Sequence, residues 1–304
     1  MSDACHRSSA GCERRERVLG IGRKVAASII LLVAALPFAF AYQQGTTAFT
    51  GTTGVNASTS AAMPGGVTVT FTAGGANVRG VQVNTSHSGS YAAQSSSYTP
   101  NITVSNPATR FATYVQGCPT TGGECANRGT LTISFSRPVR NPVLHIAGLG
   151  GGVGAPLSGS VFRVTSSVPA GITIGTATGL NLTTTGTTQF ANTNITTING
   201  SGNCTTGGNT AGCGSIPIIG TLTSITFTIG LNKQAGTYTT SEFDGYTLSV
   251  TTPEDFGDAP ATFDTPTPAA NHTVGDLTIG ANITVDNTTV ANSATSPLAS
   301  AGAN

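Results

Sequence analysis

Thr130-Leu-Thr-Ile-Ser-Phe-Ser136 is the stretch of this chain that most directly indicates its fold. The apolar residues Leu131, Ile133 and Phe135 alternate there with threonine and serine. A period of two places the apolar side chains on one face of an extended strand and the hydroxyls on the other. The stretch therefore predicts an antiparallel strand with one face in a core and the other toward solvent.

The same pattern recurs on both sides of this stretch. It begins at Val67 on the N-terminal side and again at Tyr246 on the C-terminal side. Between Leu222 and Ile225 the alternation slips phase, which predicts a β-bulge near Thr223 and Ser224. Further strands are expected at residues 77–83, 101–104, 143–146, 161–165, 172–174 and 194–198.

No helical periodicity of useful length occurs after residue 41. Many short strands separated by Gly, Asn and Pro are typical of a β-sandwich and argue against an α/β enzyme fold. We therefore predict an all-β chain in which residues 42–252 form an antiparallel sandwich of the jelly-roll or lectin-like kind. An N-terminal signal helix would precede it, and a short, incomplete β module at 253–304 would follow it.

Carboxylates are nearly absent from the main domain. Residues 42–253 contain only Glu124, Glu242 and Asp244. Glycosidases need two carboxylates beside the scissile bond, and most catalytic triads need an acid to orient the base. The glycine-rich segment 150–155 matches a dinucleotide loop, but a strand-like pattern follows it instead of a helix. We expect neither catalysis nor nucleotide binding.

Charge divides the chain near Pro253. Residues 42–253 carry seven Lys or Arg against three acids, whereas residues 254–304 carry six acids and no basic residue. Such a step in composition predicts a domain boundary. The basic residues are scattered and not interleaved with aromatics, so no nucleic-acid partner is expected.

The first 41 residues have the organisation of an export signal. A basic segment ending at Lys24 precedes the apolar residues 26–38, and Ala39-Phe40-Ala41 provides a cleavage site before Tyr42. An uncleaved membrane anchor is the alternative, although the apolar run is short and contains Pro37. We expect cleavage, and therefore a secreted or cell-surface protein.

Four cysteines follow the predicted cleavage site. An even number of cysteines in an exported chain predicts disulfides. Of the three connectivities, local pairing of Cys118 with Cys125 and of Cys204 with Cys213 is favoured, because each pair closes a short Gly- and Thr-rich loop. A zinc site is the weaker alternative, since the spacings of zinc ligands are missing.

Aromatic residues gather between positions 91 and 114. Tyr91, Tyr98 and Tyr114, with Arg110, are the candidate ligand-binding residues, because aromatics with Arg on loops are typical of contact surfaces. The alternative is that about half of these rings belong to the core. Of the histidines, His145 is expected to be a strand residue bonded to a neighbour, and His87 to lie in a polar loop.

Two stretches of the chain resemble a family of bacterial surface proteins. They are residues 133–151, which run from Ile133-Ser-Phe-Ser-Arg-Pro-Val-Arg through Asn141-Pro-Val-Leu-His-Ile-Ala-Gly to Gly151, and the later strand Tyr246-Thr-Leu-Ser-Val250. The family is that of CshA-type fibrillar adhesins, and the matching part is their second non-repetitive, lectin-like domain. The resemblance covers most of residues 44–252. It implies a ligand-binding domain that recognises host extracellular matrix glycoprotein or glycan, without indicating which residues bind.

Residues from Glu254 onward, including Asp255-Phe-Gly-Asp-Ala-Pro260, resemble the opening of a GEVED domain, a module of large bacterial surface proteins. The chain stops before the signature of that family, so a fragment is expected. Asp255, Asp258 and Asp286 would form a Ca²⁺ site if a complete module brought them together. The alternative is that these acids only form turns. No other cofactor is expected.

The sequence thus predicts a bacterial cell-surface adhesin that is not an enzyme. Two alternatives stay open. A structural stalk or surface-layer protein would be expected to show internal repeats, and none is evident in residues 42–252. A secreted carbohydrate-active enzyme would need more carboxylates than this domain contains.

Overall fold

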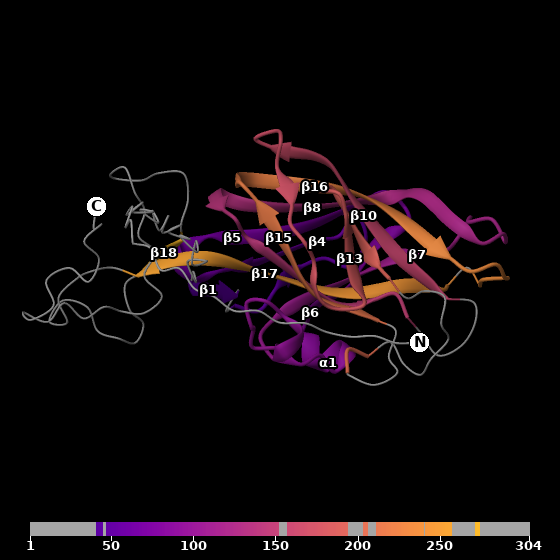
Figure 1. The fold of residues 1–304 in the computed structure, drawn as a ribbon, viewed down its shortest axis with the longest axis horizontal. Coiled ribbons are helices and arrows are strands. Elements are labelled where there is room, and N and C mark those ends of the chain that lie inside the picture. The colour runs from indigo at the N-terminus through magenta and orange to yellow at the C-terminus, as the bar shows by residue number, and fades with distance from the viewer. Residues whose placement is uncertain are drawn as a thin grey trace, which may run out of the picture. The chain divides into compact units, whose positions relative to one another are not determined.

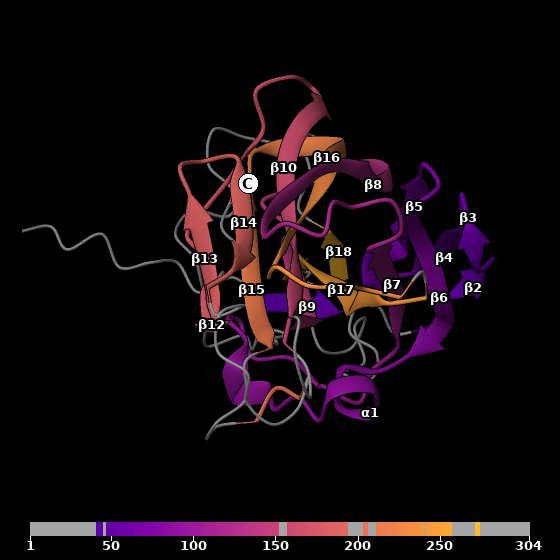
Figure 2. The same ribbon diagram turned by 90° about the vertical axis from the view of Figure 1, so that its right-hand side faces the viewer.

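The computed structural model describes residues 41–44, 47–151, 157–193, 203–205, 211–239, 241–256 and 271–273. These residues form two antiparallel sheets that pack face to face as a sandwich (Figures 1 and 2). Helical structure in this part of the chain is limited to α1 (His87–Tyr91) and two 3₁₀ turns, η1 (Pro64–Gly66) and η2 (Ser95–Ser97). The predicted all-β sandwich is confirmed.

The larger sheet has ten strands, with β17 (Phe243–Phe256) near its centre. Strands β9 (Val143–Leu149) and β7 (Ala108–Tyr114) pair with opposite edges of β17. Further strands pair outward from β9 and from β7, and two short strands pair with the C-terminal end of β17. The remaining strands are β6 (Val78–Thr85) and β3 (Gly54–Val55) beyond β7, β15 (Gly212–Ile219), β11 (Thr173–Ile174) and β12 (Thr178–Leu180) beyond β9, and β1 (Ala41–Gln44) and β18 (Asn271–Thr273) on β17.

The smaller sheet has eight strands, and its longest members are β8 (Gly123–Arg140) and β16 (Thr221–Lys233). The register between these two strands shifts between Leu222 and Ser224, which confirms the predicted bulge. The other members, in sheet order around this pair, are β13 (Leu182–Thr185), β14 (Gln189–Asn192) and β10 (Ser158–Val168) on one side, and β5 (Thr68–Gly74), β4 (Ser58–Ala62) and β2 (Thr50–Gly51) on the other.

The core lies between the two sheets and is made by the apolar members of the alternating stretches. Leu131 and Ile133 of β8 are fully buried and Phe135 nearly so, whereas Thr132 and Ser134 between them are partly exposed. Aromatic rings fill the centre, where Phe162 stacks on Phe190 at 4.6 Å between ring centroids. Burial of each such side chain contributes about 1.5–3 kcal/mol, which explains why period two determines the fold.

The remaining expectations about strands and segments have different outcomes. Residues 101–104 were expected to form a strand, but they form a loop. Strand β17 continues through Pro253 to Phe256, so the predicted boundary falls inside a strand. The expected strand at 194–198, the export signal at 1–41 except for Ala41 in β1, and most of 253–304 lie outside the described residues. No helix in the described part of the chain is long and apolar enough to cross a membrane.

Candidate ligand-binding surface

Residues 86–107, which connect β6 to β7, fold over the outer face of the ten-stranded sheet and are called the cover segment here. The segment contains α1, which lies on the side of that sheet away from the eight-stranded sheet (Figure 2). Ser86 caps α1 by accepting a hydrogen bond from the backbone N–H of Gly89 at 2.9 Å. The cover segment packs Tyr91, Tyr98 and Ile102 against Ala147 of β9.

A disulfide closes the same cluster. Cys204 and Cys213 are bonded, both are buried, and the backbone N–H of Cys204 donates to the carbonyl of Tyr91 at 2.7 Å. The second disulfide joins Cys118 to Cys125 at the start of β8. Both expected pairings are therefore present.

Two buried histidines lie beneath the cover segment. Nε2 of His87 lies 2.8 Å from the Ser249 hydroxyl, and the two ring nitrogens of His145 lie 2.9 and 2.8 Å from the hydroxyls of Ser215 and Thr251. The ring of Tyr98 packs against both imidazoles. Burial lowers the pKa of His87 to about 3, and it lowers the pKa of His145 well below 6.5.

This histidine cluster is structural. Both side chains are 0% exposed, and neither has a carboxylate partner among the described residues. Ser249 and Ser215 are themselves buried, and within the described part of the chain no acid orients either imidazole in the way that a catalytic triad requires. The expectation for His145 is confirmed. The expectation that His87 lies in a polar loop is wrong, because this residue begins α1 and packs into the sheet.

Two arginines and three aromatic rings form a row on the outer face of the ten-stranded sheet, with Tyr91 coming from α1 of the cover segment and the other four residues from β6, β7 and β17. The guanidinium of Arg110 lies 5.0 Å from the ring centroid of Tyr91, and that of Arg79 lies 4.3 Å from the ring of Tyr114. Tyr114 and Phe243 are cross-strand neighbours with ring centroids 5.2 Å apart. These five residues, called the arginine–aromatic row below, combine cation–π contacts with an exposed aromatic edge.

Gly245 joins the two halves of the row. It follows Phe243 on the same face of β17, and the Tyr91 hydroxyl donates to its carbonyl oxygen. A Cβ at this position would lie 2.9 Å from the Tyr91 hydroxyl, 3.0 Å from Nη2 of Arg110 and 3.1 Å from the ring of Phe243. Glycine is therefore the residue that allows these three side chains to meet over one point of the strand.

Asp244 points to the opposite face of β17 and is buried. Its two carboxylate oxygens accept hydrogen bonds from the backbone N–H groups of Gly150, at 2.7 Å, and Ser160, at 2.6 Å. Burial raises the pKa of Asp244 to about 6, against the opposing effects of these donors and of the charge on Arg110. The side chain thereby links the two ends of the glycine-rich connection between β9 and β10.

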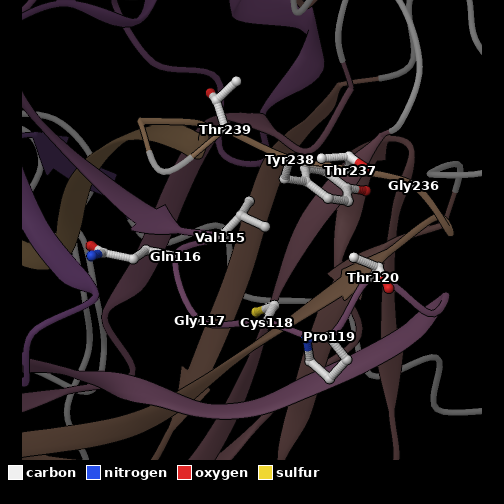
Figure 3. A pocket seen from close by; sticks show the side chains of 10 residues that line it. All are labelled: Val115, Gln116, Gly117, Cys118, Pro119, Thr120, Gly236, Thr237, Tyr238 and Thr239. Atoms are coloured by element: carbon white, nitrogen blue, oxygen red, sulfur yellow. The ribbon is translucent and has the colours of Figure 1, made fainter.

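A small pocket of about 90 Å³ lies near the row, between the β7–β8 loop and the loop before β17 (Figure 3). It is bounded by Tyr238, Pro119 and Thr120, and by Gln116, whose side-chain oxygen lies 3.5 Å from Nη2 of Arg79. Sites for small molecules are typically about 300–1,000 Å³. The arginine–aromatic row, rather than this pocket, is therefore the candidate site.

The structure separates the four predicted ligand-binding residues. Tyr114 and Arg110 are partly exposed members of the row, and Tyr91 lies under Arg110 with 8% of its surface exposed. Tyr98 is 1% exposed and serves the core of the cover segment, so its ring has no face available to a ligand in this structure.

Two members of the row were missed from the sequence. Phe243 lies out of phase with the core residues Tyr246 and Leu248, which is a signal that it faces outward. Arg79 precedes the aromatic segment by many residues, and only strand pairing brings it to Ala112, opposite on β7.

The predicted metal ligands fall almost entirely outside the described residues. Asp258 and Asp286 lie there, and of Asp255 only the backbone is described, in β17 opposite His272 of β18. Among the residues whose side chains are described, no group of His, Cys, Asp or Glu is arranged to hold a metal. The Ca²⁺ site stays a prediction.

No family model, curated protein or solved structure matches the chain. Its function is therefore inferred from the sandwich and its surface.

Proposed function

We propose that this protein is a secreted or cell-surface adhesin that binds a glycan or glycoprotein of a host through a lectin-like β-sandwich. The observation that carries the proposal is the arginine–aromatic row, which presents Tyr114 and Phe243 on a rigid sheet. Phe243 is 39% exposed although it is large and apolar. Aromatic and Arg side chains contribute most of the energy at many binding interfaces.

Support also comes from the rest of the described surface. The sandwich is poor in charge, and its two buried imidazoles are hydrogen-bonded to hydroxyl groups inside the fold. Two disulfides suit an oxidising, extracellular environment. The resemblance of residues 133–151 to CshA-type adhesins, and of residues from Glu254 onward to a GEVED module, is consistent with a bacterial surface protein.

Arrays of host matrix glycoproteins and glycans test this function. The wild-type chain should bind at least one class of these molecules. Tyr114→Ala and Phe243→Ala should each weaken that binding about tenfold, which corresponds to the loss of about 1.4 kcal/mol at a hot spot. Val168→Ala is the matched control, because Val168 is 58% exposed and belongs to β10 of the other sheet.

The other outcomes distinguish the alternatives. Turnover of a polysaccharide would identify a carbohydrate-active enzyme. If the chain shows neither binding nor turnover, a structural stalk or surface-layer protein is the function that fits the result. Binding that survives both aromatic substitutions would place the site elsewhere on the sandwich.

A further inference from the structure

We infer that the arginine–aromatic row binds an acidic polysaccharide, in which the sugar rings carry sulfate or carboxylate groups. This inference rests on the proposed function and adds the chemical class of the ligand. It is carried by the arrangement of Arg79 and Arg110, which place two guanidinium groups on the outer face of the sheet that also presents the partly exposed Tyr114 and the exposed Phe243.

The register of the sheet determines how close these arginines are. Arg79 of β6 lies opposite Ala112 of β7, and Arg110 is two residues from Ala112 along the same strand. Gln82 is the residue of β6 that pairs with Arg110, and the register shifts between Gly80 and Gln82. The two arginines therefore lie on the same face of adjacent strands, on either side of this bulge. The guanidinium of Arg79 is directed to the ring of Tyr114 and that of Arg110 to the ring of Tyr91. Both positive charges therefore lie along one face of the sheet, where an extended anionic chain can contact each of them.

Within the described part of the chain, neither arginine forms an ion pair with a carboxylate. Among the side chains that the structure describes, the one ion pair joins Arg163 to Glu124 on the other sheet. The charge on Arg110 lowers the pKa of Asp244, but the carboxylate of Asp244 points to the opposite face of the sheet and accepts two backbone N–H bonds. Glu242 accepts a bond from the backbone N–H of Thr239 at 3.0 Å.

The aromatic rings orient the guanidinium groups. Arg79 lies over the ring of Tyr114 and donates from Nε to the carbonyl of Ala76 at 2.7 Å, so the orientation of its head group is fixed. Nε of Arg110 is buried without a hydrogen-bond partner in the structure, beside Tyr91. Fixed, stacked arginines are suited to bidentate recognition of planar or tetrahedral anions.

The row also has a place for the sugar ring itself. Tyr114 and Phe243 form a tilted pair at the exposed end of the row, next to Arg79. The C–H face of a pyranose can pack on these rings while its sulfate or carboxylate group reaches the guanidinium of Arg79. A neutral sugar would use only the aromatic half of this surface, and a free inorganic anion would use only the arginines.

The test compares heparin, a sulfated and carboxylated polysaccharide, with uncharged dextran and with inorganic sulfate, using the full chain in equilibrium titrations. Heparin should bind, with an affinity that falls as salt is raised, whereas dextran and sulfate alone should bind at least tenfold more weakly. Arg79→Gln should weaken heparin binding about tenfold. Arg140→Gln removes the same charge from an exposed position in β8 and should leave binding unchanged.

The results separate this inference from the proposed function. If the chain binds neutral glycans on the array and shows no preference for heparin, the inference of an acidic ligand is wrong, whereas the proposed adhesin function still holds. Absence of binding to any glycan or glycoprotein would overturn both. Equal losses in Arg79→Gln and Arg140→Gln would show that heparin responds to net charge and not to the row. Arg110→Gln provides a second substitution in the row, and a normal unfolding transition for each variant confirms that it is folded.

Discussion

Glycine residues determine where the aromatic side chains of the outer face lie. Gly148 of β9 has a φ of +85°, and a Cβ there would lie 2.3–2.5 Å from atoms of the Tyr91 ring. Gly148→Ala must therefore displace Tyr91, and with it the ring on which Arg110 stacks. We expect a loss of about 1–3 kcal/mol in the free energy of unfolding, measured by urea denaturation.

Gly171→Ala is the control for this substitution. Gly171 has a φ of +92°, but no atom lies within 4 Å of an added Cβ. It tests the backbone penalty without the clash, so its loss of stability should be the smaller of the two. Equal losses would contradict the packing of Tyr91 against Gly148.

The carboxyl group of Asp244 should make stability depend on pH in a defined direction. Because its pKa is raised from 3.8 to about 6, the folded chain binds this proton more tightly than the unfolded chain does. Its contribution to stability is therefore complete below about pH 3.8 and declines as pH rises through about 6. The difference in unfolding free energy between wild type and Asp244→Asn should shrink from pH 4 to pH 6.5. A difference that grows with pH would contradict the raised pKa.

At the scale of elements, the disulfide between Cys204 and Cys213 should stabilise the cover segment. Replacing both cysteines by serine should cost roughly 2.5 kcal/mol, because the crosslink restricts the unfolded chain. It should also speed amide hydrogen exchange in residues 86–107, since Cys204 bonds to Tyr91. The matched control replaces Cys118 and Cys125, which close a loop of similar length at the start of β8. Equal acceleration of exchange in both variants would contradict this local role.

The histidines under the cover segment predict a loss of stability in acid. Their folded pKa values lie below 6.5, so their contribution is present above pH 6.5 and is lost as pH falls toward about 3, the pKa of His87. Each histidine can contribute a slope of up to about 1.4 kcal/mol per pH unit. The carboxyl group of Asp244 changes stability in the opposite direction over this pH range, but it is one titrating group against two histidines. Unfolding free energies at pH 7, 6 and 5 should therefore fall less steeply in a His87→Gln, His145→Gln variant, and an unchanged slope would refute burial of neutral imidazoles.

The strands were predictable from the sequence, whereas the cover segment was not. Alternation of apolar and hydroxyl residues identifies β5, β8 and β17, because each apolar residue gains by facing the core. In residues 86–107 the buried residues include His87, Tyr91 and Tyr98, whose polar groups find partners only after distant strands pair. Tyr98, for example, packs on His145 of β9, far along the chain. The spacing of residues along the sequence does not predict contacts between segments this far apart.

At the scale of the whole molecule, the sandwich acts as a rigid support for a surface that is continuous only in the folded chain. Arg79, Arg110 with Tyr114, and Phe243 come from three separate strands, and a fourth element supplies Tyr91. The aromatic segment predicted part of this surface, since it contains Arg110 and Tyr114. Arg79 and Phe243 could not be assigned to this surface from the sequence, because they join it only through the pairing of β6 and β17 with β7.

Hydroxyl-radical footprinting of the chain with and without saturating heparin tests the binding surface most directly, because it reports the exposure of individual side chains. The account predicts that Tyr114 and Phe243 lose reactivity when the polysaccharide binds, while Val168 and Ile219, which are exposed elsewhere on the sandwich, keep theirs. Protection of Val168 or Ile219 with unchanged reactivity at Tyr114 and Phe243 would contradict the arginine–aromatic row as the binding site.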